Sequence, residues 1–570
     1  MLTLGINAAY HDSAACLVQD GQLVAAAEEE RFTRIKHGKR PVPFSTWELP
    51  YHAIDFCLAR AGIDLSALDH VAYSYDPSLL LRTQDDRISL PLEPSAHAKA
   101  GPAPWEPLFL AYIVNAERQL VDGAPHHLRA RFSTAKTAGH WRWHFVEHHL
   151  SHEASAFLAS PFDATAVLTI DGRGERTATS YGHYADGKYR RLAQVPLPHS
   201  LGLLYEEVTA HLGFLRSSDE YKVMALASYG RPAYADLFRD IVRADTDGRY
   251  QVRAPRLAER FGPARRPGAE LAREHFDIAR SLQLVLEDTV LELARWLRRE
   301  TGAENLCMAG GVALNCVLNS RLRDAGVFRR VWIQPAAGDA GTALGAALWI
   351  DWNERAHERR YRMEHVYLGS DFREAEIEAV LDRAKLPYRR LDEVAEETAE
   401  LLARNRIVGW FQGRMEFGPR ALGARSILAS PLDSAMQQRL NDIKDREDFR
   451  PVAPVVLEEE AANWFAKAQA SPFMLFVFDL EEDKAARIPA VRHVDGTARV
   501  QTIRREQHPL YYDLVKAFQR RTGVPVLVNT SFNTRGQPIV CTPRDAVECF
   551  YTSPLDALVM GPFLLEKPAT

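Results

Sequence analysis

Cysteine is scarce in this sequence, and no two cysteines are spaced to act together. Six occur in 570 residues and none forms a Cys-x-x-Cys pair, which argues against a zinc ribbon and a dithiol redox site. Long apolar runs are also missing. The chain reaches His11 and Asp12 before a secretory-length run is complete, and 340–350 is too short to span a bilayer. We expect a cytoplasmic protein that is neither exported nor membrane-spanning.

An excess of charge of one sign is also absent. Seventy Lys and Arg residues stand against 75 Asp and Glu residues, giving a formal charge of −5 and a pI near 6.5. No global positive field would therefore attract nucleic acid or anionic lipid. With 46% hydrophobic and 25% charged residues, the composition is globular. We expect two large domains, or three to four smaller ones, that bind small molecules.

Neither a Walker A nor a Gly-x-Gly-x-x-Gly motif is present, but the chain repeats one longer pattern. Each copy contains an apolar strand, a polar turn and two strands joined by an Asp-Gly turn. The first copy comprises 2–7, 10–13, 14–18 and 22–27, with Asp20-Gly21 between the last two. The second comprises 166–170, 171–175, 177–184 and 189–195, around Asp186-Gly187. Matching positions lie 164 to 166 residues apart, which indicates a duplicated domain.

This plan is typical of the actin, sugar-kinase and heat-shock-ATPase superfamily, whose two lobes bind a nucleotide between them. The sequence therefore predicts an α/β domain over 1–355, with lobes of about 1–160 and 161–355. The alternative is that two unrelated segments each begin with a hairpin. A long helix over 269–300 and glycine-bearing loops at 310–315 and 337–341 follow. Such loops can bring backbone N–H groups to a phosphate or ribose, although tight helix caps have the same composition.

A charged stretch at 351–364 marks a domain boundary. Beyond it we expect a second α/β domain over 366–570. Its loops are rich in cations, chiefly within 413–426 and 444–451, and hydroxyl and amide groups gather in 528–536. Guanidinium groups bind phosphate oxygens bidentately, so these loops predict a multi-phosphate pocket built without a P-loop. Surface solvation of single arginines is the alternative.

His148 and His152 are four residues apart, so a helix would place both imidazoles on one face. With Asp339, which lies between glycines in a loop after a predicted strand, they form a two-His, one-carboxylate ligand set. That set suits Fe(II) or another first-row divalent ion. A solvated histidine-rich helix is the alternative.

In combination, the motifs resemble the nodulation-factor and antibiotic O-carbamoyltransferase family. They are YHDSAACLVQDGQLVAAAEEERFTRIKHG, HHLSHEASAF, DEYKVMALASYG, GGVALN, GDAGTALGAA, GRMEFGPRALGARS, KDRE and NTSFN. The resemblance implies an actin-like N-terminal domain similar to threonylcarbamoyl-transferring tRNA-modification enzymes. It also implies a C-terminal domain similar to threonylcarbamoyl-adenylate synthases. The C-terminal domain would make carbamoyl-adenylate from carbamoyl phosphate and ATP, and the N-terminal domain would transfer the carbamoyl group to a small-molecule hydroxyl.

The resemblance also implies roles for residues. His148, His152 and Asp339 would bind the metal, and His11 would be the general base, with Asp12 and Lys39 also catalytic. A nucleotide in the N-terminal domain would meet Asp171, Gly172, Gly310, Gly311 and Asn315. Asp219 and Lys36 or Lys39 are candidates for the acceptor cleft. In the C-terminal domain, Arg420, Lys444, Arg450, Arg499 and Ser531 would bind phosphates, and Asn529 and Asn533 would position the carbamoyl group.

The implied cofactors are ATP with Mg²⁺ and a divalent metal, Fe(II) by preference; no nucleic acid or membrane partner is expected. The segment 76–143, which matches none of these motifs, is expected to contribute to acceptor recognition. Three rival functions remain: a small-molecule kinase, a tRNA-modifying threonylcarbamoyl transferase and a non-catalytic nucleotide-driven switch. A kinase would leave the histidine pair and the cation-rich second domain without a role. The acceptor, the metal and the oligomeric state are not determined by the sequence.

Overall fold

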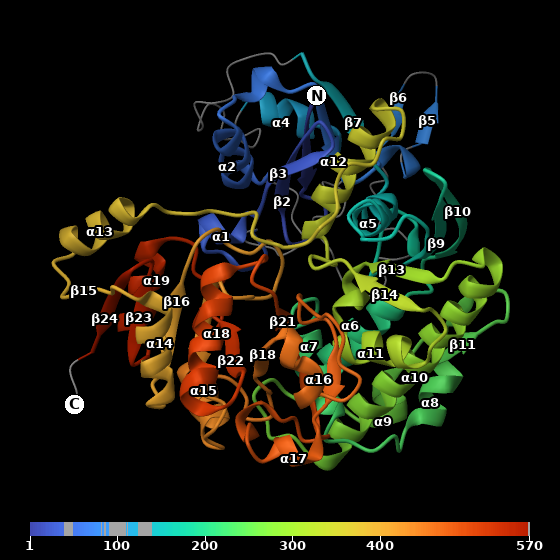
Figure 1. Ribbon diagram of the computed structural model, residues 1–570. Helices are drawn as coiled ribbons and strands as arrows, with labels where there is room; N and C mark the ends of the chain where they lie inside the picture. Colours follow the sequence, from blue (N-terminus) through green and yellow to red (C-terminus); the bar gives the residue numbers. More distant parts are fainter. Residues whose placement is uncertain are drawn as a thin grey trace. The chain divides into compact units, whose positions relative to one another are not determined.

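The computed structural model describes residues 1–38, 49–80, 82–84, 87–89, 110, 112–122 and 140–567 (Figure 1). Lys39 and most of the segment 76–143 therefore lie outside the described residues. The chain forms two compact units, Met1–Met363 and Glu364–Thr570. The charged stretch predicted as a boundary contains the division between them. No helix in the described ranges is long and apolar enough to cross a membrane. All six cysteines are buried as free thiols.

The first lobe of the N-terminal unit contains a five-stranded sheet in the order β3-β2-β1-β4-β7. Its strands are β1 (Leu2–Asn7), β2 (Ala14–Gln19), β3 (Gln22–Glu28), β4 (His70–Tyr73) and β7 (Arg142–Phe145). The first three are antiparallel, whereas β4 and β7 run parallel to β1. Asp20 and Gly21 join β2 to β3 with φ of 49° and 81°, the left-handed geometry of a tight hairpin.

The second lobe repeats this sheet in the order β10-β9-β8-β13-β14. Its strands are β8 (Thr165–Ile170), β9 (Thr177–Ala185), β10 (Lys188–Pro196), β13 (Asn305–Ala309) and β14 (Arg330–Ile333). Directions match strand for strand, and Asp186 and Gly187 form the hairpin turn with φ of 52° and 69°. The predicted duplication and the actin-like α/β plan are confirmed.

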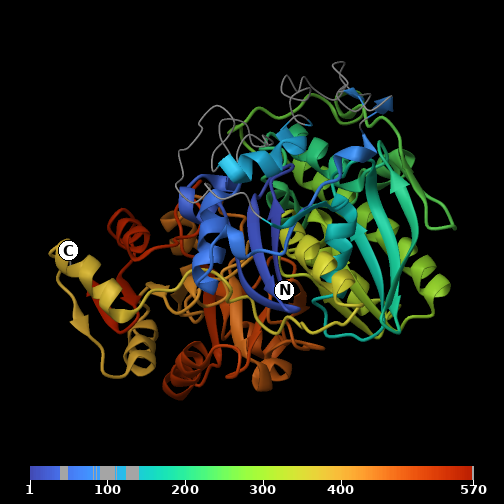
Figure 2. The same cartoon turned by 90° about the horizontal axis from the view of Figure 1, so that it is seen from above.

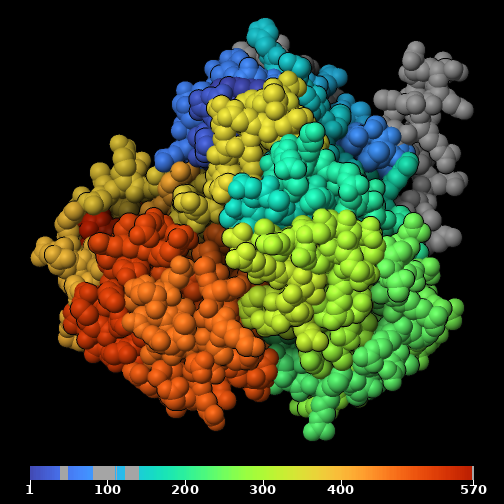
Figure 3. Space-filling view, turned by 45° about the vertical axis from the view of Figure 1, so that its right-hand side comes forward, coloured from blue at the N-terminus to red at the C-terminus, as the bar shows by residue number. Residues whose placement is uncertain are grey.

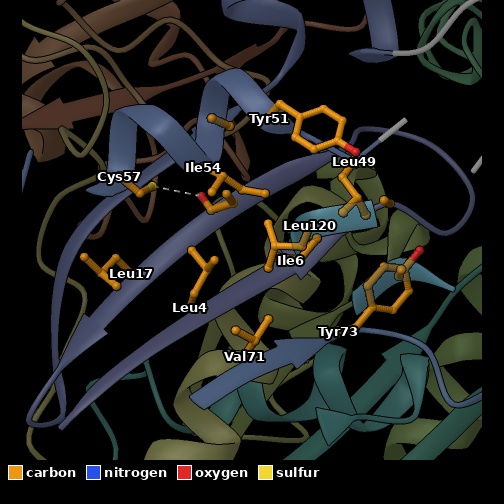
Figure 4. Close-up of a cluster of buried hydrophobic side chains, with 14 of the residues drawn as sticks. Leu4, Ile6, Leu17, Leu49, Tyr51, Ile54, Cys57, Val71, Tyr73 and Leu120 are labelled. Carbon is orange, nitrogen blue, oxygen red and sulfur yellow. Dashed lines mark hydrogen bonds between the residues drawn. The ribbon is translucent and has the colours of Figure 1, made fainter. Parts of the chain in front are cut away.

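An apolar core fills one side of the first sheet (Figure 4). Leu4 and Ile6 alternate along β1 and are fully buried, as is Leu17 on β2. Helix α2 (Tyr51–Ala61) supplies Ile54 and Cys57, and the Cys57 thiol lies 3.7 Å from the Ala15 carbonyl oxygen. Figure 2 shows α2 alongside these strands. Burial of this alternating face fixes the strand register.

Two helices meet closely at the centre of the unit. Helix α12 (Ala340–Glu354) packs on β1, β2 and β4 and against α5 (His148–Phe157). A Cβ added to Gly5 would lie 2.0 Å from the Ala343 carbonyl oxygen, and one added to Gly345 would lie 1.7 Å from that of Ser151. In Figure 3 the yellow residues of α12 lie between the blue first lobe and the cyan residues near α5. The glycines allow this close contact.

Apart from α12, the helices that follow α5 in this unit lie in the second lobe. The longest, α10, spans Arg273–Thr301 and buries a periodic apolar face, including Leu282, Val290 and Leu297, as its sequence predicts. The others are α6 (Leu201–His211), α7 (Glu220–Ala227), α8 (Ala235–Ile241), α9 (Leu257–Phe261) and α11 (Cys316–Asp324).

The C-terminal unit is built on an eight-stranded mixed sheet in the order β15-β24-β23-β16-β17-β22-β18-β21. In chain order the strands are β15 (Arg389–Arg390), β16 (Val408–Phe411), β17 (Arg425–Ala429), β18 (Ala453–Leu457), β21 (Gln501–Ile503), β22 (Val526–Ser531), β23 (Ala557–Met560) and β24 (Phe563–Glu566). Its main helices are α13 (Glu374–Arg383), α14 (Val394–Ala403), α15 (Met436–Ile443), α18 (Pro509–Thr522) and α19 (Pro543–Tyr551). Helix α18 packs on β18 and β22 and against α14.

Candidate metal centre and phosphate site

The two histidines of α5 face each other. His148 begins the helix and His152 follows one turn later, and both side chains are fully buried. Their Nε2 atoms lie 3.2 Å apart. Two nitrogens bound tetrahedrally at about 2.0–2.1 Å from one ion would be about 3.3 Å apart. The pair therefore has the separation that a shared cation requires.

Two buried carboxylates complete the cluster. Asp339, the residue before α12, places Oδ1 3.6 Å from His148 Nε2 and 3.7 Å from His152 Nε2. Asp171 follows β8, and its Oδ2 lies 3.6 Å from His148 Nε2. One ligand atom from each of the four residues lies within 4.8 Å of the others. The structure thus brings together the three predicted ligands and adds Asp171, which the sequence analysis assigned to a nucleotide.

The Asp339 carboxylate fits a cation better than it fits a purely hydrogen-bonded role. Its side chain is 1% exposed, and neither oxygen accepts a hydrogen bond from any residue that the structure describes. Burial opposes its ionisation, but His11 and His148 outweigh burial and hold the pKa of Asp339 well below its usual range. A buried carboxylate without donors requires a positive partner. The ligand types, two imidazoles with carboxylates, suit a first-row divalent ion.

Residues around the cluster orient His148. Its Nδ1 lies 3.3 Å from the Ser74 carbonyl oxygen, which places the proton there and leaves Nε2 free to coordinate. The backbone N–H of His148 donates to Glu175 Oε1 at 2.9 Å, and the N–H of Asp76 donates to the same atom at 2.7 Å. Burial raises the pKa of Glu175 to about 7. Glu175, from the second lobe, therefore fixes the start of a first-lobe helix.

His149 faces away from the cluster. Its Nδ1 lies 3.2 Å from the Ser180 hydroxyl, and burial holds its pKa well below the usual range.

His11 lies at the edge of the cluster. Its Nε2 is 3.7 Å from Asp339 Oδ2, and its Nδ1 is 2.9 Å from Asp12 Oδ2. Burial lowers the pKa of His11, but the two carboxylates outweigh it and raise the pKa to about 10. A cation bound by Asp339 would oppose this rise.

Asp12 bridges two imidazoles. Its other oxygen, Oδ1, lies 2.8 Å from Nδ1 of His37, and His37 Nε2 lies 3.1 Å from the Ser218 hydroxyl. Lys36 donates to the same hydroxyl at 3.3 Å. His37, which has a φ of 67°, was not singled out by the sequence analysis.

The predicted nucleotide residues of this unit have internal partners. The N–H of Gly311 donates to Asp171 Oδ1 at 2.6 Å, and Gly310 has a φ of 91°. The Asn315 side chain accepts from the Leu318 N–H at the start of α11 and donates to Gln283 Oε1 at 2.8 Å. These contacts are those of a tight helix cap, which the sequence analysis kept as an alternative.

The neighbouring turn is also held by ion pairs. Gly172 lies beside Glu206, which pairs with Arg173 at 3.0 Å and with Arg216 at 3.1 Å. Asp219 caps a loop by accepting from the Leu215 N–H and pairs with Lys222.

In the C-terminal unit, the buried Lys444 ammonium joins two predicted segments. It donates to the Ser531 hydroxyl at 2.8 Å, to the Ser531 carbonyl oxygen at 2.5 Å and to Asn533 Oδ1 at 2.7 Å. Burial, with Arg446 and Arg450 nearby, holds the pKa of Lys444 well below its usual range. Lys444 and its hydroxyl and amide partners, with two arginines close enough to lower its pKa, form a site suited to anionic oxygens, and a bound anion would raise that pKa again.

A second set of contacts fixes the adjacent loop. Asn529 donates to Gln501 Oε1 at 2.8 Å and to the Ala421 carbonyl oxygen at 3.2 Å, and Gln501 donates to that of Leu422. The Glu416 carboxylate accepts from three backbone N–H groups of the same loop. These bonds fix the backbone of the loop that follows Arg420. The other predicted phosphate-binding arginine, Arg499, lies two residues before Gln501. Both arginines are partly buried.

Arg425, by contrast, is structural. It is fully buried, and its guanidinium donates to the carbonyl oxygens of Gln412, Gly413 and Ser370. It also lies 3.6 Å above the Phe411 ring.

Two sheets of one topology, with imidazoles and carboxylates gathered between them, define a duplicated two-lobed α/β protein with a candidate divalent-metal centre. Comparison with known proteins identifies its family. A model described as carbamoyltransferase N-terminus matches residues 2–348, and one described as carbamoyltransferase C-terminus matches 399–567. The chain therefore belongs to the carbamoyltransferase family and is a carbamoyl-transferring enzyme.

Individual relatives extend over nearly the whole chain. An uncharacterized protein of Synechocystis sp., sll1178, is 41% identical over 613 residues, covering 99% of this chain and 97% of that protein. Nodulation protein NolNO of Sinorhizobium fredii is 40% identical over 582 residues, covering 98% and 80% respectively. Among solved structures, HypF of T. kodakarensis aligns with a TM-score of 0.34 and 15% identity, covering 62% of this chain and 48% of HypF.

Proposed function

We propose that this carbamoyltransferase uses ATP and carbamoyl phosphate to form carbamoyl-adenylate in the C-terminal unit. It then transfers the carbamoyl group to a hydroxyl of a small-molecule acceptor in the N-terminal unit. The observation that carries the proposal is the buried cluster of His148, His152, Asp171 and Asp339 with His11 at its edge. Such a cluster serves group transfer, and the cation-rich C-terminal site is a separate place for activation.

The activation step accounts for the second site. A carbamoyl carbon is a poor electrophile because nitrogen donates electron density into the carbonyl. In the proposed sequence, carbamoyl phosphate loses phosphate to water, and the resulting carbamate oxygen displaces pyrophosphate from the α-phosphorus of ATP. Lys444, with Arg446 and Arg450 close to it, would stabilise the negative charge on the phosphate oxygens. Arg420 and Arg499 are the further candidates for these oxygens.

The transfer step belongs to the cluster. A divalent ion held by His148, His152, Asp171 and Asp339 would supply positive charge beside the adenylate and the reacting carbonyl. The acceptor oxygen forms a bond to the carbamoyl carbon, the bond from that carbon to the adenylate oxygen breaks, and AMP leaves. His11, whose ring Asp12 orients at 2.9 Å, is placed to take the hydroxyl proton.

The test separates this reaction from ATP turnover by a kinase or a nucleotide-driven switch. The protein is incubated with ATP and Mg²⁺, with and without carbamoyl phosphate and in the absence of any acceptor. We expect pyrophosphate and a product with the mass of carbamoyl-adenylate only when carbamoyl phosphate is present. ATP consumption that does not depend on carbamoyl phosphate, or ADP as the product, would refute the proposal.

A further inference from the structure

A second cluster of metal-ligand type lies in the first lobe, away from the centre described above. It consists of His70 on β4, His144 on β7 and Glu354, the last residue of α12. One ligand atom from each residue lies within 4.8 Å of the others. Helix α12 rises by about 1.5 Å per residue, so its two ends, one beside Asp339 and the other at Glu354, are about 22 Å apart.

The sheet places the two imidazoles on one face. Strands β4 and β7 are parallel, with Ala72 opposite His144, and His70 and Ala72 point the same way because side chains alternate along a strand. Ala72 packs with Val146 and with Ala346 of α12, so this face is the one that α12 covers. The pairing register and the packing of α12 therefore bring the three residues together.

The donor atoms are close enough to share one ion. His70 Nδ1 and His144 Nε2 lie 2.9 Å apart, compared with about 3.3 Å for two nitrogens on a tetrahedral zinc ion. The two nitrogens would have to move apart by only a few tenths of an ångström to bind one ion. His70 is 3% exposed, so its ring is already held in place.

The charges around the cluster favour a cation. Glu354 supplies a carboxylate, and the carbonyl end of α12 carries partial negative charge. Arg142 competes with a cation for Glu354, because its Nη1 lies 3.6 Å from Glu354 Oε1. The Arg142 side chain is 71% exposed, however, and can turn into solvent.

We propose that His70, His144 and Glu354 form a second divalent-metal site, suited to Zn²⁺ with water as the fourth ligand. Two imidazoles, one carboxylate and an open position are a familiar zinc set. An ion there ties the C-terminal end of α12 to β4 and β7. The same helix begins beside Asp339, so the site would stabilise the element that carries a ligand of the main centre.

The alternative is a plain N–H···N hydrogen bond between two neutral imidazoles, which involves neither Glu354 nor a metal. Glu354→Gln separates the two explanations because it removes the carboxylate charge and leaves both histidines. His144→Gln removes a ligand. His183→Gln, on β9, is the control, because His183 belongs to none of the metal-ligand clusters among the described residues.

The full-length chain is stripped with a chelator, titrated with Zn²⁺ and analysed for tightly bound zinc. We expect His144→Gln to bind one equivalent less than the wild type and His183→Gln to match the wild type. Glu354→Gln should weaken binding at this site about tenfold or more and reduce the zinc-dependent rise in melting temperature. Wild-type affinity and stoichiometry in Glu354→Gln would overturn the proposal, even if His144→Gln failed to fold.

Discussion

The two lobes of the N-terminal unit share one topology but contribute different chemistry to their common centre. In each lobe, the turn after the first strand and the helix after the last strand of the sheet point to the centre. The first lobe supplies His11 and Asp12 from its turn and His148 from the start of α5. The second supplies Asp171 from its turn and Asp339 from the start of α12. The turn and the helix start therefore occupy equivalent positions in the two lobes. The first lobe fills them mainly with histidine, and the second lobe fills them with aspartate.

Exposure differs in the same way. The side chains of His11 and Asp12 are 26% and 32% exposed, whereas those of Asp171 and Asp339 are 8% and 1% exposed. The first-lobe turn is therefore accessible to a substrate, and the second-lobe turn is suited to holding an ion. Under the proposed function, the first-lobe turn would take part in the reaction and the second-lobe turn would hold the ion together with His148 and His152.

The largest expected effect comes from removing both helix imidazoles. We expect His148→Ala/His152→Ala to lose the bound metal and to reduce carbamoyl transfer by on the order of 10³-fold. Metal content and transfer from supplied carbamoyl-adenylate are the measurements, with His183→Gln as the control. A variant that transfers at the wild-type rate without metal would show that the centre is structural.

Lys444→Met addresses the other unit. Because the ammonium contacts Ser531 and Asn533 in the proposed phosphate site, we expect pyrophosphate release to fall by on the order of 10²-fold. Transfer from supplied carbamoyl-adenylate should persist, as should metal binding. Lys516→Met, on α18, is the control. If both steps fell together, the proposed division of labour between the units would be wrong.

Asp171→Asn separates a ligand from a nucleotide contact. The amide oxygen can still accept from the Gly311 N–H, so the loop should survive. Loss of the charge should weaken metal binding about tenfold or more. Unchanged metal affinity with weaker nucleotide binding would support the nucleotide role predicted from the sequence instead.

His37→Ala removes one of the two imidazoles that hold Asp12. We expect kcat for transfer to fall about tenfold, less than the roughly 10²–10⁴-fold expected for loss of the base itself, with KM for ATP unchanged. His37→Asn keeps a donor and should recover part of the rate, and His140→Ala is the exposed control. If the His37→Asn variant were less stable but kept the wild-type kcat, His37 would have a structural role.

Gly345→Ala tests the contact between the two central helices. The added methyl group would overlap the Ser151 carbonyl oxygen, so we expect a loss of about 1–3 kcal/mol in the free energy of unfolding. Thermal and denaturant unfolding measure it, with Asn353→Ala on the same helix as the control. No destabilisation would mean that α5 and α12 can separate freely.

Local patterns predicted the elements well. The Asp-Gly turns give positive φ at both hairpins, alternating apolar residues mark β1, and a short apolar run marks β8, so the duplicated sheet could be deduced from sequence. The facing imidazoles of His148 and His152 followed from helical spacing.

Other features depend on contacts between distant segments. Asp171 turns to the cluster because the second sheet packs beside α5, and no local pattern encodes that packing. His37 reaches Asp12 through a left-handed backbone and a contact with Ser218, 181 residues away. Asn315 could be interpreted as a nucleotide contact or a helix cap; its bonds to Leu318 and Gln283 show the capping role, and its nucleotide role stays a prediction.

Diffraction from metal-loaded crystals, collected at the absorption edge of the loaded ion, tests the central claim most directly. We predict an anomalous peak about 2.0–2.2 Å from donor atoms of His148, His152, Asp171 and Asp339. Imidazoles and carboxylates bonded only to one another, with no peak between the lobes, would contradict it.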